Sequence, residues 1–367
     1  MYIKIAERLK PFSHLPGASC ILPGSFYQLQ IFPTCLKVFD LSNASSTLQL
    51  ELHFELLGPI KGFTVQNDLE KGEVRIWGET TLGFVRYCLK SSQGGCGFRI
   101  HIEKAPQDKL CLFTAKDSWC LKAKDTLFFF CEEKIFEPFV PTLIERLSLG
   151  NSKSQDWEMV QRRQDLAEVF PVWHRLGQFI PELSQTDSAF GTFQLLKQCQ
   201  ELTFFNTPEK IIPLWTQLLL TGFTSLLVPQ FQDHLYQGIL KPDTKQNIAI
   251  SPLVLLQKGS KLISELFVRC QNSQVELLPA LPPEFHCGRL LDKQMNEGTF
   301  SIEWTKKRVR RCEFKVNAEI NAEIAFCFRH AKQCRLRSGG ADKGRIIYSG
   351  QLLHLEKKQH YFFDNFS

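Results

Sequence analysis

The spacing of apolar residues changes twice along this chain, and that change limits most strongly what the chain can fold into. Apolar residues recur in short, turn-bounded runs over residues 1–147, at helical intervals over 148–274, and in alternation over 275–367. Alternation is typical of half-buried strands, and intervals of three and four are typical of amphipathic helices. The sequence therefore predicts an α+β multidomain protein with an N-terminal β-sandwich-like domain, a central helical region and a C-terminal β-sandwich-like domain, divided at these boundaries.

The first 147 residues carry the pattern of a β-sandwich. Turns rich in Gly, Asp and Ser separate short apolar segments at spacings typical of sandwiches. These segments occupy residues 27–32, 48–57, 73–77, 84–89 and 98–102. A continuous apolar run at 127–131 predicts a strand buried on both faces. The small polar stretch 148–154 then marks the change to helices.

The central region is predicted to be helical. The expected helices are 156–170, 172–179, 190–204, 208–220, 221–236 and 251–270. Pro171 separates the first two, because proline lacks the amide hydrogen that a helix interior needs. Ser251 followed by Pro252 is a typical helix start.

Alternating strands are expected to open the C-terminal domain. Polar and apolar side chains alternate over residues 299–304 and again over 311–316, which predicts a hairpin. The basic run 306–311 falls at its turn. A run of this kind could attract nucleic acid, but it is interpreted as a solvated turn because alternate strand residues point to opposite faces.

A specific motif joins the last predicted helix to this hairpin. Residues 275–283 read Val-Glu-Leu-Leu-Pro-Ala-Leu-Pro-Pro, and a glycine-bearing loop and a strand ending in Trp304 follow. In this order, residues 260–316 resemble glycoside hydrolase family 95, the α-L-fucosidase-type enzymes. The resemblance implies that a catalytic α/α helical barrel ends here and that a C-terminal β-domain begins.

The resemblance also implies inverting hydrolysis by two carboxyl groups about 6.5–9.5 Å apart. Twelve helices form such a barrel and need roughly 200 residues, whereas residues 151–274 have room for about half of them. Counting back from Glu276 places Val254 where the family has its catalytic aspartate, and the accompanying glycine-rich segment is missing. We therefore expect a reduced, α/α barrel-like helical region that lacks the family's catalytic base.

The most polar helical stretch, residues 156–178, supplies most of the candidate site residues. Paired acids could serve as acid and base if burial separates their pKa values, while aromatic and polar side chains could stack on and hydrogen-bond a sugar. The catalytic candidates are Glu158, Asp165, Glu168 and Glu182, and the carbohydrate-binding candidates are Trp157, Trp173, His174, Arg175 and Gln178. The alternative is a solvated helix face with ion pairs and two core tryptophans.

Cysteine usage and charge bound the remaining possibilities. Thirteen cysteines without a Cys-x-x-Cys pair favour free thiols in a reducing compartment. The chain opens without an apolar signal-like run and has no stretch of membrane-spanning length, so a cytoplasmic location is expected. The spacing of Cys327, His330 and Cys334 fits no standard zinc site. No metal, cofactor, nucleic-acid partner or membrane partner is predicted, and the net charge of +6 is mild.

Three functions stay open at this point. The leading hypothesis is a glycoside-hydrolase-like protein that no longer catalyses and instead binds a carbohydrate or glycoconjugate, or acts as a scaffold. The second is a divergent active glycosidase that works through paired carboxylates. The third is a module that docks a protein partner through residues 156–178. A homo-oligomer in which another copy completes the half-barrel is also left open.

Overall fold

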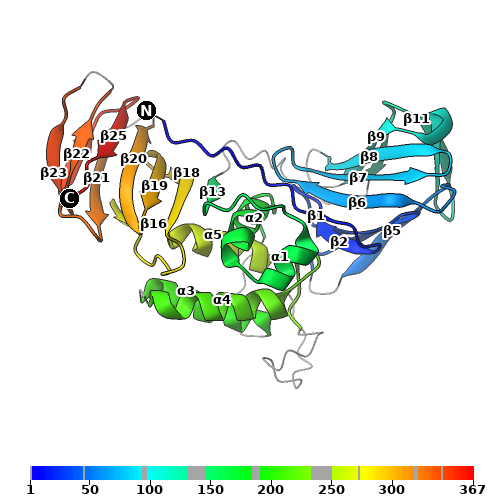
Figure 1. Ribbon diagram of the computed structural model, residues 1–367, viewed down its shortest axis with the longest axis horizontal. Helices are drawn as coiled ribbons and strands as arrows, with labels where there is room; N and C mark the ends of the chain where they lie inside the picture. Colours follow the sequence, from blue (N-terminus) through cyan, green and yellow to red (C-terminus); the bar gives the residue numbers. More distant parts are fainter. Residues whose placement is uncertain are drawn as a thin grey trace.

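The protein is built mainly from β-sheets. The computed structural model describes residues 2–43, 46–92, 97–130, 145–183, 191–205, 207–232, 250–271, 273–317, 321–339 and 342–367. Strands make up 45% of the residues and helices 20%. Over the described residues there are five sheets and five α-helices, and the helices lie between two β-regions without closing into a ring (Figure 1). The prediction of an α+β fold with a central, reduced α/α barrel-like region is therefore wrong.

Two six-stranded sheets pack against each other in the N-terminal β-region. Aromatic rings fill the space between them, with centroids 4.9 Å apart for Phe54 and Tyr87 and 6.3 Å apart for Tyr27 and Phe98. The first sheet contains, in spatial order, β1 (Phe12–Ser13), β6 (Lys61–Asp68), β7 (Glu73–Thr80), β8 (Gly83–Ser91), β9 (Gly97–Lys104) and β12 (Thr126–Phe130). The second contains β11 (Ser118–Lys122), β10 (Lys109–Phe113), β5 (Thr47–Phe54), β4 (Cys35–Asp40), β3 (Tyr27–Phe32) and β2 (Ala18–Ile21).

The predicted N-terminal strands are found, with one error in burial. Residues 27–32 form β3, and the other four predicted segments fall on β5, β7, β8 and β9. The run 127–131, in contrast, was expected to be buried on both faces. Its described part belongs to β12, an edge strand on which Phe128 is 50% exposed. Apolar composition alone does not distinguish an edge strand from a central one, because neighbouring strands decide the burial.

The C-terminal β-region also consists of two packed sheets. Phe326 links them, because its ring centroid lies 5.6 Å from that of Phe300 and 4.7 Å from that of Phe363. The larger sheet contains, in spatial order, β13 (Arg146–Ser148), β18 (Cys287–Met295), β19 (Gly298–Thr305), β20 (Arg308–Val316), β25 (His360–Asp364), β22 (Gln333–Arg337) and β23 (Arg345–Tyr348). The smaller contains β16 (Val268–Gln271), β17 (Gln274–Leu277), β21 (Ala322–Phe328) and β24 (Leu352–Leu355). The predicted hairpin is β19–β20, and its apolar residues are buried as expected.

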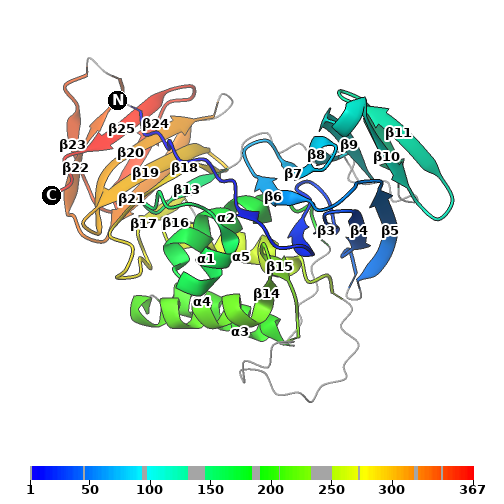
Figure 2. The same ribbon diagram turned by 45° about the vertical axis from the view of Figure 1, so that its right-hand side comes forward.

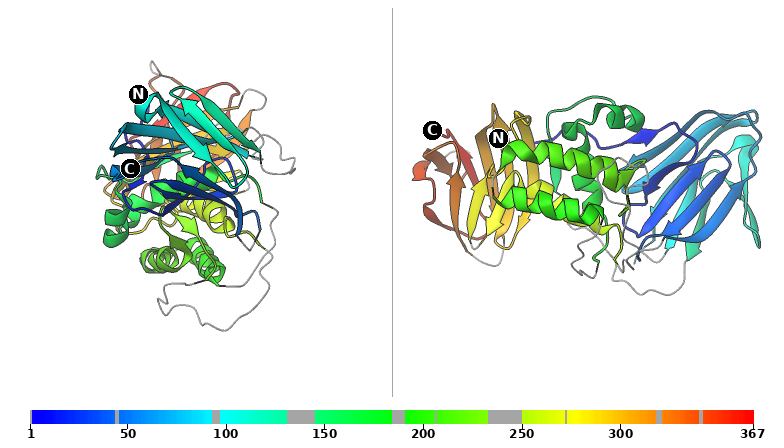
Figure 3. Two further views of the ribbon diagram at one scale, coloured as in Figure 1. Left: turned by 90° about the vertical axis from the view of Figure 1, so that its right-hand side faces the viewer. Right: turned by 90° about the horizontal axis from the view of Figure 1, so that it is seen from below.

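Two helix pairs occupy the space between the β-regions. Helices α3 and α4 run side by side, as the two bright green helices of Figure 3 show. Helix α2 packs closely on α5, and Trp173 of α2 donates a hydrogen bond to the backbone carbonyl of Leu256 at 3.3 Å. The helices are α1 (Trp157–Arg163), α2 (Leu166–Gln178), α3 (Thr192–Phe204), α4 (Pro208–Gly222) and α5 (Val254–Glu265).

Helix boundaries differ from prediction where capping or tertiary contacts decide them. The first predicted helix ends at Gln164, which has a left-handed backbone, and α2 restarts behind the N-cap Asp165 with Pro171 inside it. The predicted helix 221–236 is wrong from Phe223 to Gln232, whereas Thr221 and Gly222 belong to α4. There the chain forms β14 (Phe223–Thr224) and β15 (Val228–Pro229), and the amide of Leu226 bonds to the carbonyl of Ser19 at 3.0 Å. Residues 233–236 of that prediction lie outside the described residues.

The first residues of the chain run along both β-regions. In Figure 2 this dark blue segment starts beside β25, passes α2 and reaches β1. The Ile3 amide donates a hydrogen bond to Glu313 of β20, while Lys10 forms an ion pair with the buried Asp68 of β6 at 2.6 Å. Arg146 of β13 donates to the carbonyl of Glu7 at 3.0 Å. The segment therefore connects two sheets that belong to opposite ends of the molecule.

One cysteine pair departs from the expectation of free thiols. Cys111 of β10 and Cys120 of β11 are cross-strand partners joined by a disulfide. Nine other described cysteines are free, and Cys96 and Cys131 lie outside the described residues. Among the described helices, none combines the length and the apolar character that a membrane span requires.

Candidate functional site

The aromatic and polar residues predicted to hold a sugar lie inside the molecule. Trp157, Trp173 and His174 are each at most 2% exposed, and Arg175 is 8% exposed. The α2 side chains of this group face α5 and the N-terminal sheet rather than solvent. Arg175 donates to the carbonyl of Leu69 at 3.3 Å. This placement matches the alternative of core tryptophans and leaves no ring face on which a sugar could stack.

Gln178, the last of that group, belongs to a partly buried polar network around Glu145. Its amide side chain bonds both the amide nitrogen and the carbonyl of Glu145, at 2.7 and 3.2 Å. The Glu145 carboxylate accepts from Ser264 at 2.9 Å and lies 3.5 Å from Nε2 of His174 and 3.6 Å from Lys293. These contacts join α2, α5 and β18.

This network contains a serine, a histidine and an acid, but its geometry is not that of a nucleophilic site. The Ser260 hydroxyl lies 3.3 Å from Nδ1 of His174 and donates to the backbone carbonyl of the same histidine at 2.7 Å. Ser260 is only 2% exposed. A nucleophile needs both a base to accept its proton and a substrate within reach. The buried hydroxyl of Ser260 lacks the second condition, so the cluster holds helices together.

The predicted catalytic acids have structural partners or stand apart. Glu158 accepts a hydrogen bond from Ser13 at 2.6 Å, and Asp165 caps α2 by accepting from the amide of Ala167 at 2.9 Å. Glu168 pairs with Lys153 at 3.0 Å and with Arg163. Glu182 is exposed. Lys153 lies near both Asp165, at 3.8 Å, and Glu168, but none of the contacts of these four acids opposes two carboxyl groups across a cleft.

Electrostatics reinforce the structural role of Glu168. Burial by itself would raise the pKa of this carboxyl group, but hydrogen bonds from Arg163, Lys153 and Asn151 outweigh it and lower the pKa below its usual range. A general acid at neutral pH needs the opposite shift. Glu168 therefore stays ionised and is unsuited to protonate a leaving group.

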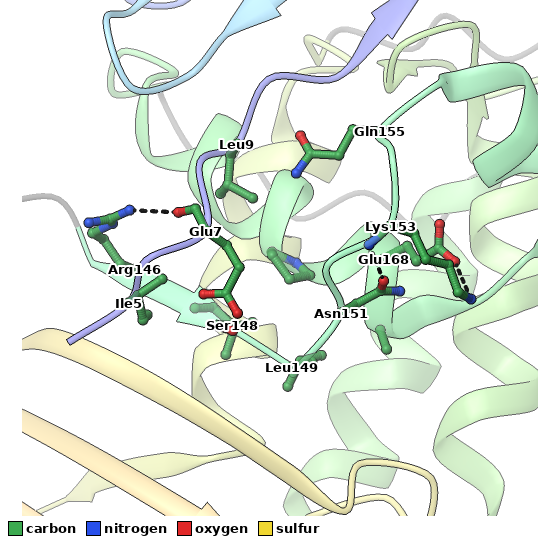
Figure 4. A pocket seen from close by; sticks show the side chains of 13 residues that line it. Ile5, Glu7, Leu9, Arg146, Ser148, Leu149, Asn151, Lys153, Gln155 and Glu168 are labelled. Atoms are coloured by element: carbon green, nitrogen blue, oxygen red, sulfur yellow. Dashed lines mark hydrogen bonds and ion pairs between the residues drawn. The ribbon is translucent and has the colours of Figure 1, made fainter. Parts of the chain in front are cut away.

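A small pocket lies beside Glu168, between the N-terminal segment and α2 (Figure 4). Figure 4 shows Lys153 next to Glu168 and Arg146 reaching the backbone of Glu7. Its cavity volume is about 30 Å³. That is room for roughly two water molecules, whereas ligand sites typically offer roughly 300–1,000 Å³. A sugar does not fit here.

A larger groove lies between α3 and α5, with a volume of about 380 Å³. Its floor is apolar and its sides carry charged and amide groups from both helices. Two lysine ammonium groups lie over the Phe193 ring, 5.0 Å from its centroid for Lys258 and 5.8 Å for Lys197. The residues that line it are Phe193, Leu196, Lys197, Gln200, Glu201, Lys258, Lys261, Leu262 and Glu265.

The sequence contains a signal for this groove, in the spacing of polar residues on α3 and α5. Lys197, Gln200 and Glu201 recur at intervals of three and four, so they share one face of α3. Lys258, Lys261 and Glu265 do the same on α5. Each set alone has the pattern of an ordinary solvated helix face. Only the packing of two helices that are some sixty residues apart brings the sets together.

No protein-family model matches the chain. A search of curated proteins gives no match either.

Proposed function

We propose that the protein binds an acidic carbohydrate in the α3–α5 groove and does not hydrolyse it. The observation that carries this proposal is the lysine-bearing groove itself, whose volume of about 380 Å³ falls within the range of ligand sites. Lysines project from both walls, Lys197 from α3 and Lys258 and Lys261 from α5. A sugar carboxylate between the walls would meet ammonium groups from two helices.

The other groove residues suit the neutral part of such a ligand. Gln200 and the two glutamates offer amide and carboxylate groups to sugar hydroxyls, which both donate and accept hydrogen bonds. Phe193, Leu196 and Leu262 form an apolar floor that is almost wholly buried, so they shape the groove, and the polar side chains above them make the contacts to the sugar. Three lysines against two glutamates give the lining a net positive charge, which favours an acidic sugar over a neutral one.

The state of the candidate acids supports binding without hydrolysis. Hydrolysis by inversion needs one protonated and one ionised carboxyl group on opposite sides of the glycosidic bond. Asp165 and Glu168 are instead engaged in a helix cap and in ion pairs. In residues 156–178, the stretch that could also dock a protein partner, the aromatic side chains of Trp157, Phe170 and Trp173 are buried, whereas Met159 is 45% exposed.

Calorimetric titration of the full chain tests this proposal. Trigalacturonic acid is the acidic probe, and cellotriose is the neutral one. We expect the acidic trisaccharide to bind more tightly. Lys197→Ala and Lys261→Ala should each weaken binding about tenfold, which corresponds to about 1.4 kcal/mol and is of the size of one hydrogen bond to a charged group.

Lys332→Ala is the matched control, because Lys332 is exposed and lies in the C-terminal β-region. Its affinity should equal that of the unaltered protein. Equal affinity for the acidic and neutral sugars, or unchanged affinity in both groove variants, would contradict the proposal.

Glycosidic hydrolysis is the second candidate, because Glu201 and Glu265 both line the groove. Incubation with the same trisaccharide and measurement of new reducing ends separates the two functions. We expect no release. Release that disappears in Glu201→Gln or Glu265→Gln would replace a binding function with a catalytic one.

A further inference from the structure

Three metal-ligating side chains gather on the outer face of the N-terminal sandwich, far from the α3–α5 groove in the chain. Cys35 is on β4, and Glu51 and His53 are on β5. One potential ligand atom of each lies within 4.8 Å of the other two. The register of the sheet produces this proximity, because Cys35 pairs directly with His53 and Lys37 pairs with Glu51. The inward-facing neighbours Leu36 and Leu52 are fully buried, so the three ligand residues point outward.

The distances within this cluster are close to those of a tetrahedral zinc site. The Cys35 sulfur lies 3.7 Å from Oε1 of Glu51, and Nε2 of His53 lies 3.4 Å from the same oxygen. Zinc bonds of about 2.3 Å to sulfur and about 2.0–2.1 Å to nitrogen and oxygen give tetrahedral edges of roughly 3.5 and 3.3 Å. Small side-chain rotations would therefore place all three ligands around one ion.

A neighbouring ring supports this arrangement of ligands, and the chemical types of the three ligands select the ion. The Phe113 ring stacks on the imidazole of His53 at a centroid distance of 5.3 Å, which holds the ring on the sheet. Thiolate, imidazole and carboxylate together suit zinc, whereas magnesium and calcium prefer oxygen ligands alone. Two anionic ligands would balance the charge of a divalent ion.

From this arrangement we infer that Cys35, Glu51 and His53 bind a zinc ion, with solvent in the fourth position. Among the described residues, Lys37 is the cation that contacts this cluster, and its Nζ lies 3.5 Å from the Glu51 carboxylate. Its ammonium group contacts the same carboxylate that a zinc ion would bind, so the two cations compete for Glu51. Lys37 is partly exposed and can swing into solvent when the ion binds.

A second cluster in the same domain provides the contrast. Glu73, Cys88 and Glu103 also bring their ligand atoms within 4.8 Å of one another. Both glutamates are already paired, since Arg75 bridges them and Lys90 and Arg86 add further ion pairs. A metal ion at this cluster would have to displace four ion pairs, so Cys88 serves as the matched control for Cys35.

Competition between the full chain, free of a histidine tag and stripped of metal, and a chromogenic zinc chelator tests the site. Cys35→Ser and His53→Ala should each weaken zinc binding at least tenfold, while Cys88→Ser should leave it unchanged. Lys37→Met should strengthen binding several-fold, because it removes a like charge about 4 Å from the ion. Cobalt added in place of zinc should give a thiolate-to-metal absorption band that Cys35→Ser abolishes.

If a variant that lacks a ligand folds poorly, Lys37→Met still tests the site, because this variant keeps all three ligands and methionine is similar in size to lysine. Thermal unfolding of each metal-free variant checks folding, and zinc should raise the melting temperature of the unaltered chain. Zinc binding equal in the unaltered chain and in folded Cys35→Ser would overturn the inference. A cobalt complex without the thiolate band, or weaker binding by Lys37→Met, would do the same.

Discussion

His174 shows how one residue can look functional in a sequence and be structural in the fold. Its Nδ1 lies 3.0 Å from the carbonyl of Ser260, so this nitrogen carries the proton and donates it. Burial lowers the pKa of His174, and this effect exceeds the opposite influence of the nearby Glu145 carboxylate. The imidazole is therefore neutral and held in one tautomer between α2 and α5.

This lowered pKa makes a prediction about stability and pH. As pH falls, the unfolded chain protonates His174 near its ordinary pKa of 6.5, before the folded protein does. The contribution of this residue to stability is thus complete above about pH 6.5 and is lost as pH falls through the lower folded-state pKa. In urea unfolding between pH 7.5 and 5, His174→Gln should lose less free energy of unfolding than the unaltered protein, by up to about 1.4 kcal/mol per pH unit.

His286→Gln is the control, because His286 is exposed and the contacts of the described residues include no ion pair of its ring. Its pH dependence should follow that of the unaltered chain. If the free energy of unfolding fell equally with pH in His174→Gln and in the unaltered chain, the buried imidazole would not be the cause of the loss of stability at acidic pH.

At the scale of elements, α2 and α5 approach each other through glycines. A Cβ atom on Gly177 would lie 2.3 Å from the carbonyl oxygen of Leu256, and one on Gly259 would lie 2.6 Å from the Trp173 ring. No side chain fits at either position without moving a helix. The glycines therefore allow the contact that buries Trp173 and His174.

Gly177→Ala should destabilise the protein even though alanine is the better helix former. The gain in helix propensity is about 1 kcal/mol, whereas overpacking of a tight core typically costs about 1–3 kcal/mol. Since the clash is with backbone, which cannot rotate away, the cost should lie in the upper half of this range, and we expect a net loss of about 1–2 kcal/mol in urea unfolding. Lys210→Ala, at an exposed position of α4, should change stability by less than about 0.5 kcal/mol. Equal stability of Gly177→Ala and the unaltered chain would show that the helices can separate at little cost.

Elements whose burial depends on local alternation were predictable from the sequence, and those set by distant partners were not. Polar and apolar residues alternate over 27–31 and over 299–304, and these stretches form most of β3 and β19. Residues 223–229 are apolar enough for a helix, but contacts with β2 near Ser19 draw them into short strands. The break between α1 and α2 at Gln164 depends on a left-handed residue followed by an Asp cap, a local signal that Pro171 obscured.

At the scale of the whole molecule, the order of β-rich, helical and β-rich segments was readable, but the sites were not. The α3–α5 groove and the Cys35 cluster each depend on which helix or strand lies beside which. A single sequence does not state these neighbours. The prediction of a helical barrel was wrong for the same reason. The helices pack in pairs between two β-regions and do not form a ring.

The N-terminal segment contacts both β-regions, at β20 and at β6. The effect of detaching it from the C-terminal β-region should be measurable. Ile3 is buried beside β20, and the Tyr2 ring lies 5.4 Å from that of His360 on β25. Ile3→Ala removes apolar contact worth roughly 1–2 kcal/mol and should let this end of the segment detach. Hydrogen exchange at the amides of β25 should then become faster, while exchange in β7 stays unchanged, because the Lys10–Asp68 ion pair still anchors the other end.

The neighbouring Lys4→Ala, at an exposed position, is the control and should leave hydrogen exchange in both strands unchanged. Unchanged exchange of β25 in Ile3→Ala would mean that the C-terminal sheet is stable without the segment.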